Sequence, residues 1–189
     1  MVSLPSPDWN TGGSRTRCGC IGTEEPGIAL AMHVADPRDA ERIQALIRGL
    51  SMHSRYQRFF VPLHELPPPL LAQFTSADPV ATVTLLVETP DHAGTKLIAM
   101  AQYVAAPFPE RCEIAVVVAD GWQRRGIGSR LLRTLKQLAC AAGVTRIEAD
   151  ILADNGAMLK LARRLGYSLT RLGGGIVHAS LAVEAPCPE

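Results

Sequence analysis

Apolar residues recur along the chain with two different periods, which separates expected strands from expected helices. Alternating or continuous apolar runs predict strands at residues 28–34, 80–88, 97–105, 111–118, 146–151, 168–172 and 176–183. Apolar residues spaced three and four apart predict helices at about residues 36–50, 127–142 and 154–166. Because strands and helices alternate, the pattern predicts a mixed α/β sheet.

The two ends of the chain lack this patterning. Residues 1–26 contain Pro, Ser, Gly and Thr without an apolar stretch, and residues 184–189 contain proline. We therefore expect a disordered leader, one folded domain over residues 27–183 and a flexible end. The leader lacks the apolar segment of a secretory signal, and no run approaches the roughly 18 apolar residues of a membrane span. The expected location is cytoplasmic, with no membrane partner.

Composition and charge narrow the function classes further. The chain has 189 residues, of which 47% are hydrophobic, enough for one sizeable core. Its net charge of +1 gives no support for nucleic acid as a partner. The five cysteines lack the spacing of a zinc site, and so do the histidines, so no metal is expected. Whether the chain forms a homodimer stays open.

The most informative segment is 116–132, where a β-branched run passes through a turn into a helix. The turn reads Gln-Arg-Arg-Gly-Ile-Gly, and its glycines, Gly126 and Gly128, let a ligand approach the main chain closely. The start of the following helix presents unpaired N–H groups and positive potential. Every charge between Gly121 and Gly143 is basic. These features predict a cradle for a diphosphate.

The turn fits neither the dinucleotide fingerprint nor the nucleotide triphosphate loop. It resembles the Gln/Arg-x-x-Gly-x-Gly/Ala loop of the GNAT superfamily of N-acetyltransferases, with Gln123, Gly126 and Gly128 at the defining positions. The resemblance implies acetyl-CoA as co-substrate and a mostly antiparallel sheet of six to seven strands with about four helices. The residues it assigns to cofactor binding are Val116, Val117, Val118, Gln123, Arg124, Arg125, Gly126, Ile127, Gly128, Ser129, Arg130 and Asn155.

Downstream segments extend the resemblance. Asn155 begins the helix after the strand at 146–151, where the family's Asn binds the pantetheine arm; it also suits a plain helix N-cap. Many family members carry a Tyr seven residues later, which protonates the leaving thiolate. Here that position is Ala162. Either no dedicated acid is used or another residue acts, and Tyr167 is favoured as a core aromatic.

Upstream, the segment Leu-Ser-x-x-Ser-Arg-Tyr-x-Arg-Phe-Phe at residues 50–60 resembles one GNAT branch in particular. That branch includes the bacterial protein lysine acetyltransferases, and in it a short helix and an acidic end follow, here at residues 66–78. Arg55 and Arg58 share a helix face. They could steer an acidic substrate, although a structural role is favoured.

Glu113 is the best candidate for catalysis. It lies within Cys-Glu-Ile-Ala-Val at residues 112–116, on the strand that feeds the cradle, and the branch has its general base at the matching place. Attack on a thioester needs a neutral amine, so a carboxylate that collects the proton would assist. The alternative is a solvent-facing Glu. Asp120 is favoured as a turn cap, and Glu148 and Asp150 as surface residues, although either could bind a cationic substrate.

Three functions remain open from the sequence. The first is acetyl transfer from acetyl-CoA to a lysine ε-amine of a protein. The second is the same reaction on a small amine, such as an amino acid, a polyamine or a drug. The third is a non-catalytic acyl-CoA sensor. The cradle would contact only the acetyl donor, so its sequence cannot distinguish these three functions.

Overall fold

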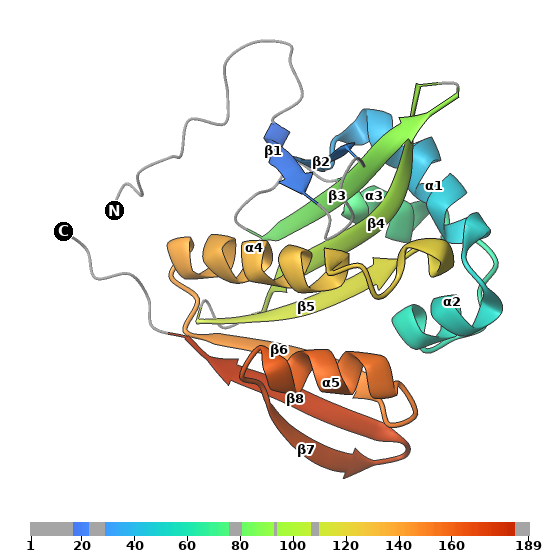
Figure 1. Ribbon diagram of the computed structural model, residues 1–189. Coiled ribbons are helices and arrows are strands. Elements are labelled where there is room, and N and C mark those ends of the chain that lie inside the picture. The colour runs from blue at the N-terminus through green and yellow to red at the C-terminus, as the bar shows by residue number, and fades with distance from the viewer. Residues whose placement is uncertain (1–16, 23–28, 76–80, 93, 107–109, 184–189) are drawn as a thin grey trace.

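One mixed sheet organises the chain, as Figure 1 shows. The computed structural model describes residues 17–22, 29–75, 81–92, 94–106 and 110–183. The strands follow the order β1-β2-β3-β4-β5-β6-β8-β7, and every neighbouring pair is antiparallel except β5 and β6. They are β1 (Arg17–Gly22), β2 (Ala29–Val34), β3 (Thr82–Asp91), β4 (Gly94–Ala105), β5 (Arg111–Val118), β6 (Arg146–Leu152), β7 (Ser168–Gly173) and β8 (Ile176–Ala182).

Helices pack on both faces of this sheet. They are α1 (Ala40–Gly49), α2 (Met52–Phe59) and α3 (Pro68–Phe74) on one face, with α4 (Ile127–Ala141) and α5 (Gly156–Arg164) on the other. Short 3₁₀ turns, η1 (Pro37–Asp39) and η2 (Asp120–Trp122), precede α1 and α4. None of the helices described has the length and apolarity needed to cross a membrane.

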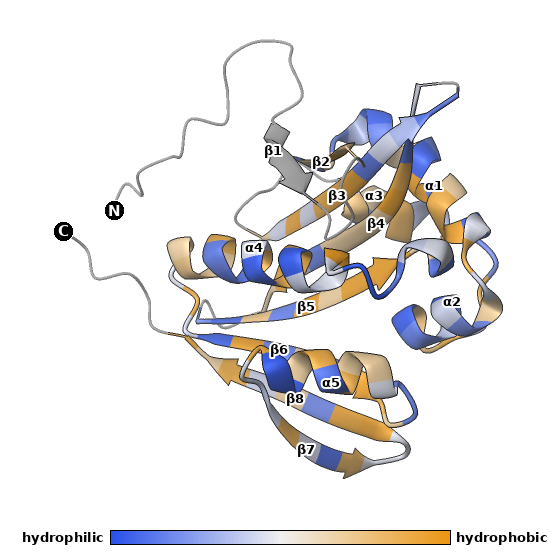
Figure 2. Cartoon of the chain, in the orientation of Figure 1, coloured by the Kyte–Doolittle hydropathy of each residue, from blue (hydrophilic) through white to orange (hydrophobic). Residues whose placement is uncertain are grey.

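The alternation of side chains along the strands divides the core into two. On β5, Cys112 and Ile114 are buried beneath α4, whereas Val117 packs with α1 and α3 on the opposite face. Figure 2 shows the apolar strands between helices whose outer positions are hydrophilic, and a strongly hydrophilic turn between β5 and α4. Both faces of β5 are therefore fixed by apolar burial, so its register and the position of the turn after it are fixed as well.

The predicted α/β architecture is confirmed. The clearest difference is β1, which lies inside the expected disordered leader and pairs with the edge of β2. It raises the number of strands to eight in the part of the chain that the structure describes, one more than the six to seven expected. Its sequence, Arg-Cys-Gly-Cys-Ile-Gly, has little strand propensity, and pairing with a neighbouring edge is a tertiary effect. The rest of the expected leader and residues 184–189 lie outside the described residues, so the domain boundaries stay a prediction.

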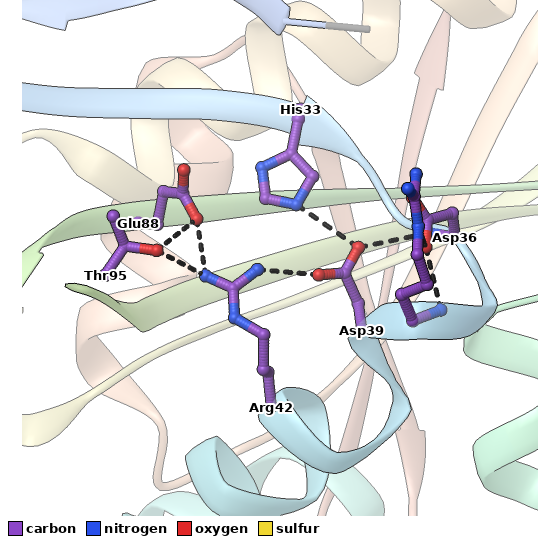
Figure 3. A network of polar contacts seen from close by, with 7 residues as sticks. His33, Asp36, Asp39, Arg42, Glu88 and Thr95 are labelled. Carbon is purple, nitrogen blue, oxygen red and sulfur yellow. Dashed lines mark hydrogen bonds and ion pairs between the residues drawn. The ribbon is translucent and has the colours of Figure 1, made fainter. Parts of the chain in front are cut away.

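A buried polar network fastens the start of α1 to the sheet (Figure 3). Asp39 accepts hydrogen bonds from Arg42 at 2.7 Å and lies 3.3 Å from the ring nitrogen of His33. Arg42 also donates to Glu88 and to Thr95, and Thr95 donates to Glu88 at 2.9 Å. Burial opposes ionisation of Glu88, but the hydrogen bonds from Arg42 and Thr95 outweigh it and lower its pKa. Since each buried charge has a partner, the network holds α1 in one position.

Candidate active site

The turn between β5 and α4 has the backbone geometry of an anion-binding concavity. Arg124 and Gly126 both adopt left-handed conformations, with φ of 63° and 79°. Gly126 is the N-cap of α4, and the first helical hydrogen bond runs from the Arg130 amide to its carbonyl oxygen at 3.1 Å. The amides of residues 127–129 therefore have no carbonyl partner within the helix. They form, with the helix dipole, a site suited to paired phosphoryl groups.

Positive charge surrounds this turn. The guanidinium of Arg125 lies over the ring of Trp122, 4.9 Å from its centroid, and this contact orients the side chain beside the turn. Arg124 and Arg130 are exposed at the same place. Helices α4 and α5 each carry three Arg or Lys residues and no Asp or Glu. A polyphosphate ligand would thus meet positive potential on this whole helical face.

Gln123, which the sequence assigns to the cofactor, has an internal role in the structure. Its side-chain amide donates to the hydroxyl of Ser54 and to the carbonyl oxygen of Val118, both at 3.1 Å. The side chain therefore fastens the turn to α2 and to the end of β5. A part in cofactor binding stays a prediction for this residue.

Helix α2 is tied to the same turn by two serines. Ser51 is the N-cap of α2, and its hydroxyl accepts from the Ser54 amide at 3.1 Å. Asp120 accepts from the Ser51 amide at 2.8 Å and from both serine hydroxyls at 2.7 Å. Burial opposes ionisation of Asp120, but these hydrogen bonds outweigh it and hold its pKa below the usual value. The Ser-x-x-Ser part of the branch signature thus joins α2 to the cradle, a role that the sequence did not reveal.

The two arginines of α2 contact other parts of the protein and are partly buried, whereas the sequence favoured solvated structural side chains. Arg55 donates to carbonyl oxygens at the end of α1. The guanidinium of Arg58 lies over Phe59 and Phe74, at 4.8 and 5.7 Å from the ring centroids. Burial lowers the pKa of Arg58 to about 10, and the negative charge of Glu113 opposes part of this shift. Arg58 therefore places a buried cation within electrostatic reach of Glu113.

The parallel pair, β5 and β6, separates after a short paired segment. Pairing joins residues 111–113 to residues 146–148, whereas β5 continues to Val118 and β6 to Leu152. Figure 1 shows the two strands diverging toward the end where α4 and α5 begin. Glu113 is the last paired residue of β5, about 17 Å along the strand from Val118 at roughly 3.3 Å per residue. The two strands are therefore unpaired between Glu113 and the turn before α4, and we call this unpaired stretch the opening.

The three valines beside this opening point to different cores. Val116 and Val118 pack against the core under α4, and Val117 is 6% exposed in the core under α1 and α3. Ile127 is likewise buried. Val117 and Ile127 could therefore contribute to a ligand only through backbone N–H and C=O groups, whereas Val116 and Val118 are half-buried.

Glu113 is exposed on the sheet face opposite α4, at a cavity of about 190 Å³. Glu148, Asp150, His178 and Leu172 line the same cavity. Strand register explains the cluster, because Glu113 is opposite Glu148, and Asp150 is opposite His178. The sequence favoured surface positions for Glu148 and Asp150, with cation binding as the alternative. Their cluster with Glu113 and His178 depends on pairing between distant strands.

Two positions downstream bear on the leaving group and the pantetheine arm. Asn155 is the N-cap of α5, and its Oδ1 accepts from the Met158 amide at 3.0 Å. The capping role is therefore present, and cofactor binding by Asn155 stays a prediction. Ala162 is 2% exposed and packs in the core, so no ionisable group occupies the position of the family's Tyr.

The nearby buried thiol and phenol are poor proton donors. Cys112 lies in the core, and burial raises the pKa of its thiol to about 12. Tyr167 is also buried, and burial raises its pKa above the ordinary value. Both are core residues, as the sequence favoured for Tyr167.

Comparison with known proteins identifies the class. A model of the acetyltransferase (GNAT) family matches residues 50–167. An acetyltransferase of Pseudomonas aeruginosa is 29% identical over 129 residues, which is 68% of this chain and 69% of that protein. Acetyltransferase Pat of Mycolicibacterium smegmatis is 42% identical over 71 residues, 38% of this chain and 21% of that protein. The solved GNAT domain of S. lividans PAT has a TM-score of 0.79 and 28% identity, covering 87% of this chain and 96% of that domain.

The chain therefore belongs to the acetyltransferase (GNAT) family, and it is an acyltransferase by class. The predicted resemblance to the branch of protein lysine acetyltransferases is confirmed by the similarity to Pat proteins.

Proposed function

We propose that this protein transfers the acetyl group of acetyl-CoA to a primary amine, most readily the ε-amine of a lysine on a protein. One observation carries the proposal. Strand β5 joins an exposed glutamate near its start to the turn before α4, whose amides suit paired phosphoryl groups, along the opening between β5 and β6. Acetyl-CoA is the co-substrate of the family to which the chain belongs, and a structural neighbour from Salmonella typhimurium was solved with it.

The donor would occupy the helical face and the opening. Its diphosphate would accept hydrogen bonds from the amides of residues 127–129, with Arg124 and Arg125 beside it. The pantetheine arm would run between β5 and β6, past Asn155, toward Glu113. A backbone N–H of β5 would then stabilise the oxyanion that develops on the thioester carbonyl.

The acceptor cavity suits a single cationic side chain. Its volume of about 190 Å³ is below the roughly 300–1,000 Å³ typical of small-molecule sites. It is open to solvent, since Glu113, Asp150 and Leu172 are exposed. Its carboxylates would attract an ammonium group, and Leu172, 62% exposed at the rim, offers apolar contact to the surface around a lysine. These features favour a protein substrate over a small amine enclosed on all sides.

Glu113 would accept the proton that the amine must lose. A lysine ammonium has a pKa near 10.4, so its deprotonation at pH 7 costs about 4–5 kcal/mol. Glu113 is a carboxylate at the end of the opening, where the amine and the thioester would meet. It would take the proton directly or through a water molecule.

Glu113→Gln tests this role. We expect turnover to fall by about 10²–10⁴-fold, because general-base catalysis is lost while the cradle is unchanged. Calorimetry should give an unaltered affinity for acetyl-CoA. Glu41→Gln, an exposed glutamate of α1, is the matched control and should keep the wild-type rate. A wild-type rate in Glu113→Gln would overturn the assignment of the base.

A panel of acceptors tests the substrate class. The protein is incubated with acetyl-CoA and either lysine-containing proteins or small amines, and thiol release is followed. Transfer to proteins supports the proposal. Transfer to small amines alone would favour the small-molecule reaction, and tight binding of acetyl-CoA without any transfer would favour a sensor.

A further inference from the structure

Besides Glu113, the acceptor cavity contains a histidine and an aspartate that contact each other, on the two strands that follow β5 in the sheet. His178 of β8 and Asp150 of β6 are opposite each other in the antiparallel register. The Nδ1 atom of His178 lies 2.9 Å from Oδ1 of Asp150. Both residues line the cavity that contains Glu113. The pair is therefore part of the site where the amine would be bound, rather than an isolated surface contact.

The hydrogen bond determines which ring nitrogen is free to act. A carboxylate accepts hydrogen bonds and donates none, so Nδ1 of His178 must carry the proton. The lone pair of a neutral ring is then on Nε2, which lies 3.9 Å from Oε1 of Glu148. An aspartate that holds a histidine in one tautomer, with the other nitrogen facing the substrate, is the arrangement of a general base.

Charged side chains from several elements lie around the ring of His178. Glu148 and Asp150 of β6 face His178, and Glu113 of β5 lines the same cavity. Two cations lie near these carboxylates: Arg111 of β5, 3.8 Å from Glu148, and Arg58 of α2, within electrostatic reach of Glu113. On β7, the residue opposite His178 is Thr170, which does not titrate in this range. The surroundings are thus predominantly acidic.

We propose that His178, oriented by Asp150, accepts the second proton that the amine nitrogen loses, after Glu113 has taken the first, a role that rests on the proposed function. When the neutral amine bonds to the acetyl carbon, its nitrogen becomes positively charged and still carries two protons. One of these N–H bonds breaks, its electron pair stays on the nitrogen, and the proton bonds to Nε2; the intermediate then expels the CoA thiolate. The resulting imidazolium lies between Glu148 and Asp150, and half-buried His178 reaches solvent, to which the proton is later released. An imidazole is intrinsically a stronger base than a carboxylate, so it suits this second transfer.

The chain offers a matched control for this pair. His92 and Asp91 are adjacent exposed residues of the β3–β4 hairpin, where Asp91 accepts from the His92 amide. They lie on strands outside the acceptor cavity. The variants His178→Gln and Asp150→Asn can therefore be compared with His92→Gln and Asp91→Asn.

The test is the pH profile of kcat/KM with a lysine-containing protein as acceptor. We expect a loss of about 10–100-fold in His178→Gln and a smaller loss in Asp150→Asn, with the acidic limb of the profile displaced in both. The KM for acetyl-CoA and both hairpin controls should match the wild type. A loss of activity with an unmoved acidic limb would show a structural role and overturn the proposal.

Long-range ¹H–¹⁵N spectra of the wild type give a second measurement that needs no variant. The proposal requires a neutral His178 ring protonated on Nδ1, and a ring protonated on Nε2 would overturn it. Full activity and an unchanged profile in His178→Gln would also overturn it, while a loss in Glu113→Gln would leave the proposed function standing. No transfer to any amine by the wild type would instead overturn the proposed function.

Discussion

Two glycines of the turn before α4 are under different constraints. Gly126 has a φ of 79°, where an alanine would be strained by about 1–2 kcal/mol. A Cβ on Gly128 would instead lie 3.7 Å from Leu161 and 3.8 Å from Val118, at ordinary contact distances. We expect Gly126→Ala to weaken acetyl-CoA binding about tenfold, because relief of the strain moves the cradle amides. Isothermal titration calorimetry measures the affinity.

Gly128→Ala is the control for that prediction and should keep most of the affinity, since its methyl group fits the available space. A bulkier residue at position 128 should reduce binding. If Gly126→Ala and the wild type bound acetyl-CoA equally well, the left-handed conformation at Gly126 would not be needed for binding.

At the residue scale, the sequence locates positions better than it gives roles. The glycines and arginines of the cradle follow from local motif chemistry, because helix starts bind anions whatever the rest of the chain does. The side chains of Gln123 and Asp120 instead bind serines of α2, about 70 residues away. Nothing in the local pattern around either residue encodes that partner.

At the element scale, Asp120 attaches α2 to the cradle, and we expect Asp120→Asn to weaken this attachment. The variant loses charge-assisted hydrogen bonds from Ser51 and Ser54. We expect unfolding to become easier by about 1 kcal/mol at pH 7, which lowers Tm by about 2–4 °C. Asp91→Asn, an exposed residue of the β3–β4 hairpin, should change Tm little.

The same variant has a defined pH dependence. The folded-state pKa of Asp120 is lowered, so its ionisation contributes stability that is fully present above the unfolded pKa of about 3.9. That contribution is lost as the pH falls through the lower folded value. Urea denaturation measures the free energy of unfolding of both proteins. The difference between wild type and Asp120→Asn should be constant from pH 7 to about 5 and should narrow below pH 4. If the difference in free energy of unfolding stayed the same in acid, the variant would instead have lost packing.

The strands and helices themselves are largely readable from the sequence, since each has a clear apolar period. The strand at residues 111–118 and the hairpin formed by β7 and β8 are both predicted from this period. Register between distant strands is not readable, because alternation shows which face a residue occupies but not its neighbour. For that reason the exposed positions of Glu148 and Asp150 follow from alternation, but the Asp150–His178 pair does not.

At the scale of the whole molecule, opposite charges occupy opposite faces of one sheet. All charged side chains of α4 and α5 are basic, whereas the cavity on the other face contains Glu113, Glu148 and Asp150. A net charge of +1 conceals this separation. It matches an anionic donor on one face and a cationic acceptor on the other, with the opening between β5 and β6 connecting them.

This separation predicts that salt weakens donor binding through the phosphates alone. The screening length falls from about 10 Å at 0.1 M salt to about 3 Å at 1 M. We expect the Kd of acetyl-CoA to rise several-fold from 0.05 to 0.5 M NaCl, measured by calorimetry. Acetyl-pantetheine, which has the thioester arm without phosphates, should bind more weakly but with little dependence on salt. Equal salt dependence for the two donors would contradict electrostatic attraction by the α4 and α5 face, because only the phosphates distinguish them.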